Sequence, residues 1–169
     1  PVGYVSIQFF KGPHFGGYRE EMAYPLLLDM SIHHFDLIRC FLQQDIAAVT
    51  VTSINAPWNW NQGDATVMAH LETEGGAAVS YVGSWVSQGW ETTWNGDWRF
   101  EGPKGVLLWR NGEVAFSAGA DTKEAVPLVE MPAVHQARLL EVELPVRPRR
   151  IDQRKADFLL AVVTVCRFA

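Results

Sequence analysis

The sequence predicts an α+β domain in which a mostly antiparallel, open-faced β-sheet carries helices on one face. Three observations support this fold class. An apolar periodicity typical of a helix covers residues 25–42, strand-like runs follow one another from residue 48 onward, and two connections between those runs carry the residues of tight turns. Because hairpins join antiparallel neighbours, we expect most of the strands to pair in that sense.

The first part of the chain predicts one strand and one long helix. Residues 2–10 alternate as a strand does, and Lys11-Gly12-Pro13 ends this run. After a glycine-containing loop, Pro25 suits the first turn of the helix, because the N–H group that proline lacks would have no partner there. Gln43-Gln44-Asp45 then ends the helix.

Five further strands are predicted after the helix. They cover residues 49–54, 66–73, 77–85, 94–101 and 106–109. Glu74-Gly75-Gly76 and Arg110-Asn111-Gly112 are the two hairpin signals, since glycine and asparagine tolerate the positive φ that tight turns need. We expect one domain over residues 1–145, with residues 146–169 forming a C-terminal tail or, after Arg154, a further helix of the same domain.

The composition is that of an ordinary soluble protein and argues against two classes of partner. Of the 169 residues, 48% are hydrophobic and 20% are charged, which is enough for one proper core. A net charge of −5 without a lysine-rich tract argues against nucleic acid. No apolar run reaches the roughly 20 residues of a membrane helix. Two isolated cysteines, Cys40 and Cys166, suggest a reducing cytoplasm.

Residues 28–36 place two carboxylates and two imidazoles in an otherwise apolar helix. At about 100° per residue, Asp29, His33 and Asp36 share one face. The other face, which we expect to pack, carries Leu28, Ser31, Phe35, Ile38 and Leu42. A carboxylate one turn before an imidazole orients the ring and stabilises its charged form, as a general acid or base requires. We therefore expect Asp29 and His33 to be catalytic, and Asp36 to bind substrate or to fix the His33 ring; the alternative is a structural hydrogen-bond network.

Aromatic residues concentrate between residues 58 and 98, where six of the seven tryptophans lie. Indole faces stack on the C–H faces of sugars, but they also pack sheets and interfaces. Trp90, Trp94 and Asn95 lie in a glycine-containing connection, and we expect them to reach a substrate. From the loop before the helix, Arg19 is expected to hold a substrate hydroxyl or carboxylate through its planar guanidinium.

A metal site built from residues of the same helix is a weaker hypothesis. His33 and His34 are adjacent and diverge by about 100°, so only one of them can join Asp29 and Asp36. The resulting set is rich in oxygen for zinc. We therefore expect no metal, and we expect His34 to support His33 or to lie in an interface.

The helical segment from residue 28 to residue 39 resembles the D-x-G-x-H-x-x-D helix in the C-terminal domain of the Gfo/Idh/MocA oxidoreductases, the family of glucose-fructose oxidoreductase and inositol dehydrogenase. Ser31 stands where that pattern has glycine. The similarity extends over most of residues 1–116, through Gly17-Tyr18-Arg19, Gly63-Asp64-Ala65-Thr66, Gly75-Gly76, Gly83-Ser84-Trp85 and the segment from Trp98 to Gly105.

The resemblance implies a C-terminal domain of the kind found in glyceraldehyde-3-phosphate dehydrogenase, which binds substrate and forms oligomers. In the family, an N-terminal Rossmann domain binds NAD(P) and supplies a lysine that acts with the Asp and the His of this helix on a hydroxyl of a sugar or cyclitol. By this likeness, His33 transfers the proton or binds the hydroxyl, and Asp29 positions the substrate or the imidazole.

The sequence contains neither GxGxxG nor GxxxxGK[ST], so we expect no Rossmann domain in this chain and no cofactor bound by it alone. The expected function is that of the isolated substrate-binding domain of an NAD(P)-dependent oxidoreductase acting on a sugar, cyclitol or similar polyol. Whether the chain itself is an enzyme stays open. The alternative is a catalytically silent domain that binds carbohydrate or dimerises. We expect a sugar-like ligand, and a homo-oligomer formed through the open face of the sheet.

Overall fold

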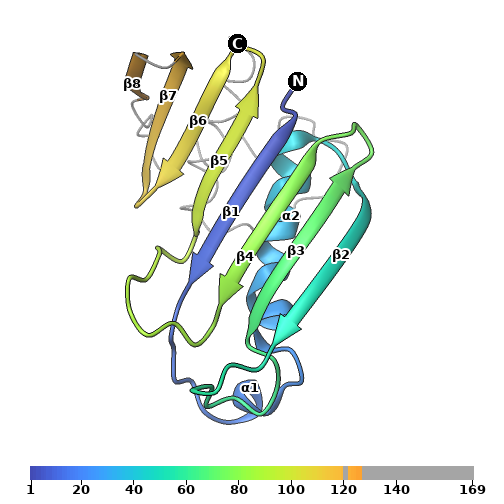
Figure 1. The fold of residues 1–169 in the computed structure, drawn as a ribbon, viewed down its shortest axis with the longest axis vertical. Helices are drawn as coiled ribbons and strands as arrows, with labels where there is room; N and C mark the ends of the chain where they lie inside the picture. The colour runs from blue at the N-terminus through green and yellow to red at the C-terminus, as the bar shows by residue number, and fades with distance from the viewer. Residues whose placement is uncertain (120–121, 127–169) are drawn as a thin grey trace, which may run out of the picture. The chain divides into compact units, whose positions relative to one another are not determined.

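The computed structural model describes residues 1–119 and 122–126, which form one extended sheet with short helical segments (Figure 1). In chain order the elements are β1 (Tyr4–Phe10), α1 (Tyr18–Glu21), the π-helix η1 (Leu26–Ser31), α2 (Ile32–Leu42), β2 (Ile46–Ile54), β3 (Thr66–Thr73), β4 (Ala78–Ser84), β5 (Asp97–Gly102), β6 (Gly105–Arg110), β7 (Glu113–Gly119) and β8 (Thr122–Val126). The boundary predicted at residue 145, the tail over residues 146–169 and the helix after Arg154 lie outside the described residues.

Eight strands of the described residues make a mixed sheet in the order β2-β3-β4-β1-β5-β6-β7-β8. β1 pairs with β4 in parallel, so that Tyr4 lies beside Ala78 and Phe10 beside Ser84. The pairs β1–β5, β2–β3, β3–β4, β5–β6 and β6–β7 are antiparallel. The expectation of a mostly antiparallel sheet is therefore confirmed, with one parallel pair at its centre.

Six of these eight strands are predicted by the sequence, and both hairpin signals lie where two strands turn. Between β3 and β4, Gly76 has a φ of 81°; between β6 and β7, Asn111 and Gly112 have φ values of 53° and 81°. These are the left-handed conformations that tight hairpins need. The second strand of the later hairpin, β7, escapes prediction because its sequence, EVAFSAG, is rich in small residues with little β-propensity.

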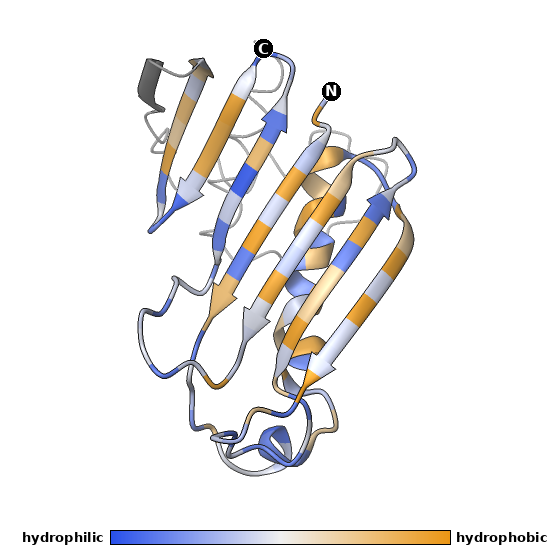
Figure 2. Ribbon diagram, viewed as in Figure 1, coloured by the Kyte–Doolittle hydropathy of each residue, from blue (hydrophilic) through white to orange (hydrophobic). Residues whose placement is uncertain are grey.

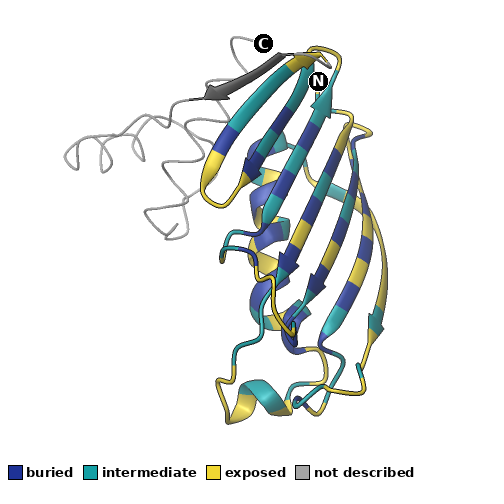
Figure 3. Cartoon of the chain, turned by 60° about the vertical axis from the view of Figure 1, so that its left-hand side comes forward, coloured by how far each residue is buried: buried dark blue, intermediate teal, exposed yellow. Residues whose placement is uncertain are grey.

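One face of the sheet forms the hydrophobic core with η1 and α2, which lie against it in Figure 1. Along the central strands, apolar residues alternate with polar ones (Figure 2) and buried residues with more exposed ones (Figure 3). The largest fully buried side chains of the strands are Ile7, Phe9, Leu71, Tyr81 and Trp98. Phe41 of α2 meets Trp98 and Phe100 edge-on, with ring centroids 5.6 and 5.8 Å apart. The core thus joins the helix to strands on both sides of β1.

The helix packs only part of the expected face: Ser31 and Ile38 are buried as expected, but other positions differ. Leu28, predicted to pack, is 56% exposed, whereas His34 is completely buried. The buried positions of η1 and α2 are Leu26, Met30, Ser31, His34, Leu37, Ile38 and Phe41. His34, expected to support His33 or to lie in an interface, lies in the core instead, where the hydroxyl of Tyr81 gives its imidazole a hydrogen-bond partner.

The helix ends as predicted. The residue after α2, Gln43, adopts a left-handed conformation with a φ of 53°, and its N–H donates to the carbonyl of Arg39. This arrangement closes the last turn. None of the helices in residues 1–119 is long and apolar enough to cross a membrane.

The opposite face of the sheet is covered by none of the described elements. Tyr4 of β1, Met68 of β3 and Val82 of β4 are 38%, 44% and 38% exposed there. Polar side chains lie between them, including a hydrogen bond of 2.8 Å between the hydroxyls of Tyr4 and Ser80. The described part of the chain therefore has one packed face and one open face.

Candidate functional site

Three connections meet at the end of the sheet where β1 and β4 finish, in the lower part of Figure 1. They are residues 11–25, 55–65 and 85–96. Backbone hydrogen bonds tie the first to each of the others: the N–H of Gln62 donates to the carbonyl of Glu20, and the N–H of Ser87 donates to the carbonyl of Lys11. The connections thus form one structured surface beside the start of the helix that carries Asp29.

Asp29 lies on η1 and is held by Arg19 of α1. The Nε–H of Arg19 donates to Oδ2 of Asp29 at 3.0 Å, and the two side chains are 38% and 24% exposed. The guanidinium carbon lies 5.0 Å from the ring centroid of Tyr18 and 5.3 Å from that of Phe15. The structure therefore brings together two of the predicted site residues, as an oriented and solvent-reachable carboxylate–guanidinium pair.

His33 is exposed on the first turn of α2. In the described part of the chain, no hydrogen bond or ion pair joins it to Asp29, whose carboxylate is engaged by Arg19 instead. Asp29 and His33 are thus neighbours in sequence that both reach solvent, but they do not form a bonded acid–base pair in this conformation.

Asp36 lies farther along α2 and takes part in a surface ion pair. It is 74% exposed, and its carboxylate accepts a hydrogen bond of 3.2 Å from Arg39. Arg39 also binds Asp45, at 2.6 Å, and the hydrogen bond to Asp45, followed by the charges of Asp45 and Asp36, raises the pKa of its guanidinium. The structure does not bring Asp36 to the pair formed by Arg19 and Asp29.

Trp94 belongs to an aromatic cluster next to that pair, consisting of Phe9, Phe15, Trp85 and Trp94. The rings of Phe15 and Trp94 are stacked with centroids 6.3 Å apart, and Trp85 meets Trp94 edge-on at 6.0 Å. Phe15 and Trp94 are about half exposed, at 49% and 48%. Because Phe15 also lies under Arg19, contacts run without interruption from Trp94 to Asp29.

Trp90 and Asn95, from the same connection, are placed differently. Trp90 is fully exposed with a φ of 52°, and its ring stacks on none of the described residues. Asn95 uses its backbone carbonyl to accept a hydrogen bond of 2.6 Å from the indole N–H of Trp98. Neither of them contacts Asp29 or Arg19 in this conformation.

The connection that carries Trp90 is tied down before it at Ser87, whose N–H donates to the carbonyl of Lys11, and after it at Glu91 and Thr92. The carboxylate of Glu91 accepts hydrogen bonds of 2.8 Å from Lys11 Nζ and from the backbone N–H of Gly12. These two bonds, that of Lys11 first, lower the pKa of Glu91. The N–H of Thr92 donates to the carbonyl of Phe10 at 3.0 Å. Trp90 therefore stands at the tip of an anchored loop.

Beneath the site lies a buried polar group that the sequence does not single out. The Ser31 hydroxyl donates to the Tyr81 hydroxyl at 2.9 Å, and the Tyr81 hydroxyl lies 3.3 Å from Nδ1 of His34. All three side chains are completely buried, and burial raises the pKa of Tyr81 well above its usual value. The sequence signal for this group is Ser31 at the position where the helix pattern has glycine.

The family of the chain follows from its match to a family model. The model of the GFO/IDH/MocA C-terminal domain matches residues 8–108, which include the end of β1, the helix with Asp29 and His33, and most of β6. The chain belongs to this family. The resemblance seen in the sequence is thus confirmed. No curated protein matches the chain.

Solved structures share the fold of this GFO/IDH/MocA domain. An Agrobacterium radiobacter oxidoreductase, in complex with NAD+, L-tartaric acid and magnesium, is 13% identical with a TM-score of 0.66; the match covers 100% of this chain and 48% of that one. An inositol dehydrogenase homolog from Azotobacter vinelandii, complexed with NADH and myo-inositol, is 19% identical with a TM-score of 0.64, covering 95% and 44%. UDP-N-acetylglucosamine 3-dehydrogenase GnnA from Acidithiobacillus ferrooxidans is 15% identical with a TM-score of 0.64, and the match covers 97% of this chain and 52% of that one.

These identities show a common fold, and the chain spans about half the length of the solved relatives. The fold agrees with the expected class, the C-terminal domain of the glyceraldehyde-3-phosphate dehydrogenase type.

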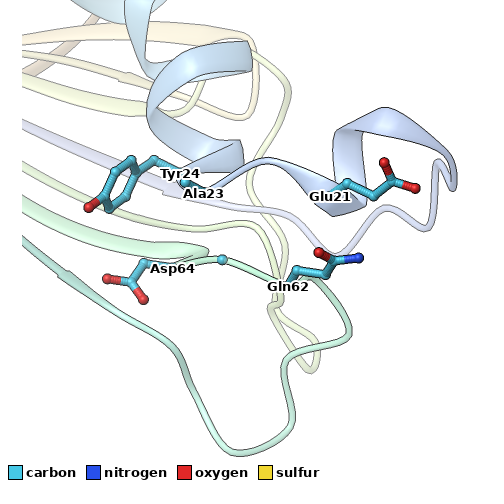
Figure 4. Close-up of a pocket in the computed structure, with 6 residues that line it drawn as sticks. Glu21, Ala23, Tyr24, Gln62 and Asp64 are labelled. Atoms are coloured by element: carbon cyan, nitrogen blue, oxygen red, sulfur yellow. The ribbon is translucent and has the colours of Figure 1, made fainter.

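A pocket next to α1 adds residues that were not predicted for the site (Figure 4). Its volume is about 360 Å³, and it is lined by Glu21, Ala23, Tyr24, Gln62, Gly63 and Asp64. Its two walls touch closely, because a Cβ on Gly63 would lie 2.1 Å from the carbonyl oxygen of Ala23. Asp64 is held by a hydrogen bond of 2.6 Å from Ser53. The Gly63-Asp64 motif, noted for its family resemblance, thus serves to close the loop over residues 55–65 against the segment before η1.

The described residues of this domain do not fit a dinucleotide. The helix after β1, α1, has four residues and carries Glu20 and Glu21 in its first turn, where they would repel a pyrophosphate. The N–H of Gly16 in the preceding loop already donates to the Glu20 carboxylate at 2.9 Å. The Gly16 N–H is therefore not available to a pyrophosphate.

A metal ion also lacks a site within residues 1–119. No group of three or more His, Cys, Asp or Glu side chains in the described part of the chain could hold one. Of the four residues considered for such a site, Asp29 pairs with Arg19 and Asp36 pairs with Arg39, while His34 lies in the core. The side chains therefore do not converge.

Proposed function

We propose that this chain is the substrate-binding domain of an NAD(P)-dependent oxidoreductase that acts on a hydroxyl of a sugar, cyclitol or similar polyol. The observation that carries the proposal is the oriented, solvent-reachable carboxylate of Asp29 on the helix of the family pattern. Solved relatives in complex with myo-inositol and with L-tartaric acid, which both carry more than one hydroxyl, support this substrate class.

In this proposal Asp29 accepts a hydrogen bond from a substrate hydroxyl. Arg19 engages one of its oxygens, Oδ2, and leaves Oδ1 to the substrate. A carboxylate that keeps a guanidinium partner remains an acceptor, and such charge-assisted bonds are the stronger ones. Arg19 itself has terminal N–H groups that point to no described partner, and these can hold a second hydroxyl or a carboxylate.

His33 moves the proton of the substrate hydroxyl. It is exposed at the start of α2, and an imidazole changes its charge near neutral pH, as a group that accepts and returns protons must. Because Asp29 is engaged by Arg19, the substrate hydroxyl, rather than a direct bond between the two side chains, links Asp29 to His33 in this proposal.

The aromatic cluster supplies the apolar part of the substrate site. The half-exposed rings of Phe15 and Trp94 fit the C–H face of a sugar or cyclitol, and they lie next to Arg19. Trp90 and Asn95 are proposed as further contacts from the same connection, with Trp90 closing on the ligand from its anchored loop. Asp36, one turn beyond His33, is proposed at the rim.

Hydride transfer requires a nicotinamide held against the substrate carbon. Solved relatives contain NAD+ or NADH, and the residues described here do not fit a dinucleotide. We propose that the cofactor is held by a part of the enzyme other than these residues. The chain's own side chains then bind the polyol, orient its hydroxyl and carry its proton.

The open face of the sheet is proposed to form a homo-oligomer. It exposes Tyr4, Met68 and Val82 on adjacent strands, and association with a second copy of the chain would remove these apolar side chains from water. The acidic composition and the two isolated cysteines support a cytoplasmic protein without a nucleic-acid partner.

A catalytically silent carbohydrate-binding or dimerisation domain is the second candidate. The observation that favours it is that Asp29 bonds to Arg19 and not to His33. Such a domain keeps the polyol site, but it has no need of an imidazole that exchanges protons with the ligand.

The proposal is tested by calorimetric titration of the full chain with myo-inositol, D-glucose and L-tartrate. We expect binding of at least one of them, and its loss in Asp29→Asn, which keeps the shape of the side chain but removes its charge. The control is Asp45→Asn, which removes an exposed carboxylate just after the end of α2 and should bind normally. Equal binding by Asp29→Asn, or no binding by the unaltered chain, would contradict the proposed site.

The two candidates are separated by the number of protons that the chain takes up or releases when it binds the polyol. If His33 contacts the bound hydroxyl, binding changes the proton affinity of the imidazole, and the number of protons exchanged with buffers of different ionisation enthalpy differs between the unaltered chain and His33→Gln. If the domain is silent, His33→Gln binds the polyol with the same proton balance as the unaltered chain.

A further inference from the structure

Tyr81 makes two buried hydrogen bonds that the proposed function does not use. We propose that the Tyr81 hydroxyl is a positioning group, which fixes the junction between η1 and α2 and thereby the orientation of Asp29 relative to His33. This inference rests on the proposed roles of Asp29 and His33, but its test does not require substrate.

The geometry places the two partners of Tyr81 on opposite sides of the junction. Ser31 is the last residue of η1, and His34 lies in the first turn of α2. The Ser31 hydroxyl donates to the Tyr81 oxygen at 2.9 Å, which leaves the Tyr81 proton to be donated to Nδ1 of His34 at 3.3 Å. One oxygen atom on β4, in the middle of the sheet, therefore holds both helical segments.

The junction decides how Asp29 and His33 lie with respect to each other. Asp29 is two residues before Ser31, on the π-helical side, and His33 immediately precedes His34, on the α-helical side. A π-helical turn contains an additional residue compared with an α-helical turn, and such turns are frequent at functional sites. If η1 rewound as an α-helix, Asp29 would rotate about the helix axis by up to about 100° relative to His33.

The ring of Tyr81 makes contacts of its own, so the effect of its hydroxyl can be separated from the effect of its ring. The rings of Tyr81, His34 and Phe9 pack together, with centroids of 5.7 Å for His34–Tyr81 and 4.8 Å for Phe9–His34. Phe35 also meets Tyr81 edge-on at 5.2 Å. Tyr81→Phe keeps these ring contacts and removes one atom, and the buried Ser31 and His34 side chains both lose their hydrogen bond to it.

The hydrogen bond to Tyr81 depends on Ser31, a residue in which this sequence differs from the helix pattern. The helix pattern that the chain resembles has glycine at this position, and glycine has no hydroxyl to donate. The bond from Ser31 to Tyr81 therefore adds a tie between the end of η1 and the sheet that the pattern itself does not contain.

The test compares Tyr81→Phe with Tyr4→Phe in the full chain. Tyr4 offers a matched control, because its hydroxyl also bonds to a serine, Ser80, at 2.8 Å, but on the open face of the sheet. We expect Tyr81→Phe to shift or broaden the amide signals of residues 28–34 in nuclear magnetic resonance spectra, and to move the pH midpoint of the His33 imidazole. Tyr4→Phe should leave both unchanged.

Two results would overturn the proposal. The first is a Tyr81→Phe protein that is less stable but has unchanged signals for residues 28–34 and an unchanged His33 midpoint, since a purely structural hydroxyl gives that result. The second is an equal change in both variants. Ser31→Ala provides the same test at the other end of the bond if Tyr81→Phe does not fold, and we expect the same signals to move.

Polyol affinity distinguishes this inference from the proposed function. Where the unaltered chain binds a polyol, Tyr81→Phe should weaken the affinity about fivefold, the factor that corresponds to a typical net hydrogen-bond energy. If the unaltered chain binds none of the tested polyols, the proposed function fails, while the resonance shifts of residues 28–34 still decide whether Tyr81 positions the junction.

Discussion

The Nε atom of Arg19 lies 3.0 Å from Oδ2 of Asp29, and this bond joins α1 to η1 across the connection that precedes the family helix. Both side chains are partly exposed, at 38% and 24%, and ion pairs of this kind contribute little to stability. The consequence of the bond is orientation. It directs the Asp29 carboxylate and holds the guanidinium against Phe15 and Tyr18.

Arg19→Gln should therefore affect binding more than folding. We expect the free energy of unfolding in urea to fall by less than about 1 kcal/mol, because the pair is exposed to solvent. Polyol affinity should fall more strongly, and Arg19→Lys should not restore it, since lysine lacks the planar guanidinium. Arg110→Gln removes a similar Nε–carboxylate bond, of 3.3 Å to Asp97, away from the site and is the control. Unchanged affinity in Arg19→Gln would remove Arg19 from the site.

The strands and turns could be predicted from local patterns, because each depends on residues close in sequence. Alternation marks β3 over the same residues, 66–73, in the sequence and in the structure. The Asn111-Gly112 turn needs only its own positive φ values. Likewise, the helix end at Leu42 depends on the next residue, Gln43, which adopts the left-handed conformation.

The buried face of the helix could not be predicted in this way, because it depends on contacts between distant residues. Tyr81 follows Ser31 by fifty positions in the sequence, and no local pattern connects the two. Because the sequence does not reveal this partner, it gives no reason to place His34 in the core, and His34 was expected to support His33 or to lie in an interface. The π-helical winding of η1 has no signature in the sequence either. A prediction that assumes 100° per residue throughout the helix therefore assigns some residues of this segment to the wrong face. The partner of Asp29 was missed for the same reason, since the bond to Arg19 crosses a loop.

The observed packing of the helix predicts that alanine substitution of two leucines changes the free energy of unfolding by very different amounts. Leu37 is 6% exposed and Leu28 is 56% exposed. Leu37→Ala should lower the free energy of unfolding by about 2–5 kcal/mol, because it leaves a cavity in the core. Leu28→Ala should change it by no more than about 0.5 kcal/mol. Urea denaturation of both variants measures the difference, and similar losses would mean that the helix packs the face expected from the sequence.

Gly63 is predicted to be required by close packing and not by its φ. An added Cβ would lie 2.1 Å from the carbonyl oxygen of Ala23, a backbone atom that cannot turn aside. Gly63→Ala should therefore force apart the two walls of the pocket and destabilise the chain by about 1–3 kcal/mol. Gly3→Ala is the control, because nothing lies within 4 Å of a Cβ at that position. Equal stability of the two variants in urea would contradict the close approach of residues 23 and 63.

Glu91 is predicted to make the loop with Trp90 sensitive to acid. Its folded-state pKa is lowered, first by the hydrogen bond from Lys11 and then by that from the Gly12 N–H. A lowered pKa means that the stabilisation is complete above the pKa of the unfolded state, about 4.3, and is lost as the pH falls through the lower folded value. Below that range the protonated carboxyl no longer holds Lys11. Because Glu91 is largely exposed, the effect should be confined to the loop.

Amide hydrogen exchange of Gly12 measures this local effect. In the unaltered chain, we expect protection of the Gly12 N–H to decrease as the pH falls below about 4.3, the pKa of the unfolded-state carboxyl. Glu91→Gln should show low protection that does not change over the same range, because an amide has no charge to lose. Glu113→Gln, on exposed β7, is the control and should follow the unaltered chain. If protection of Gly12 falls equally in the unaltered chain and in Glu91→Gln, some other group anchors the loop and leaves Trp90 at its tip.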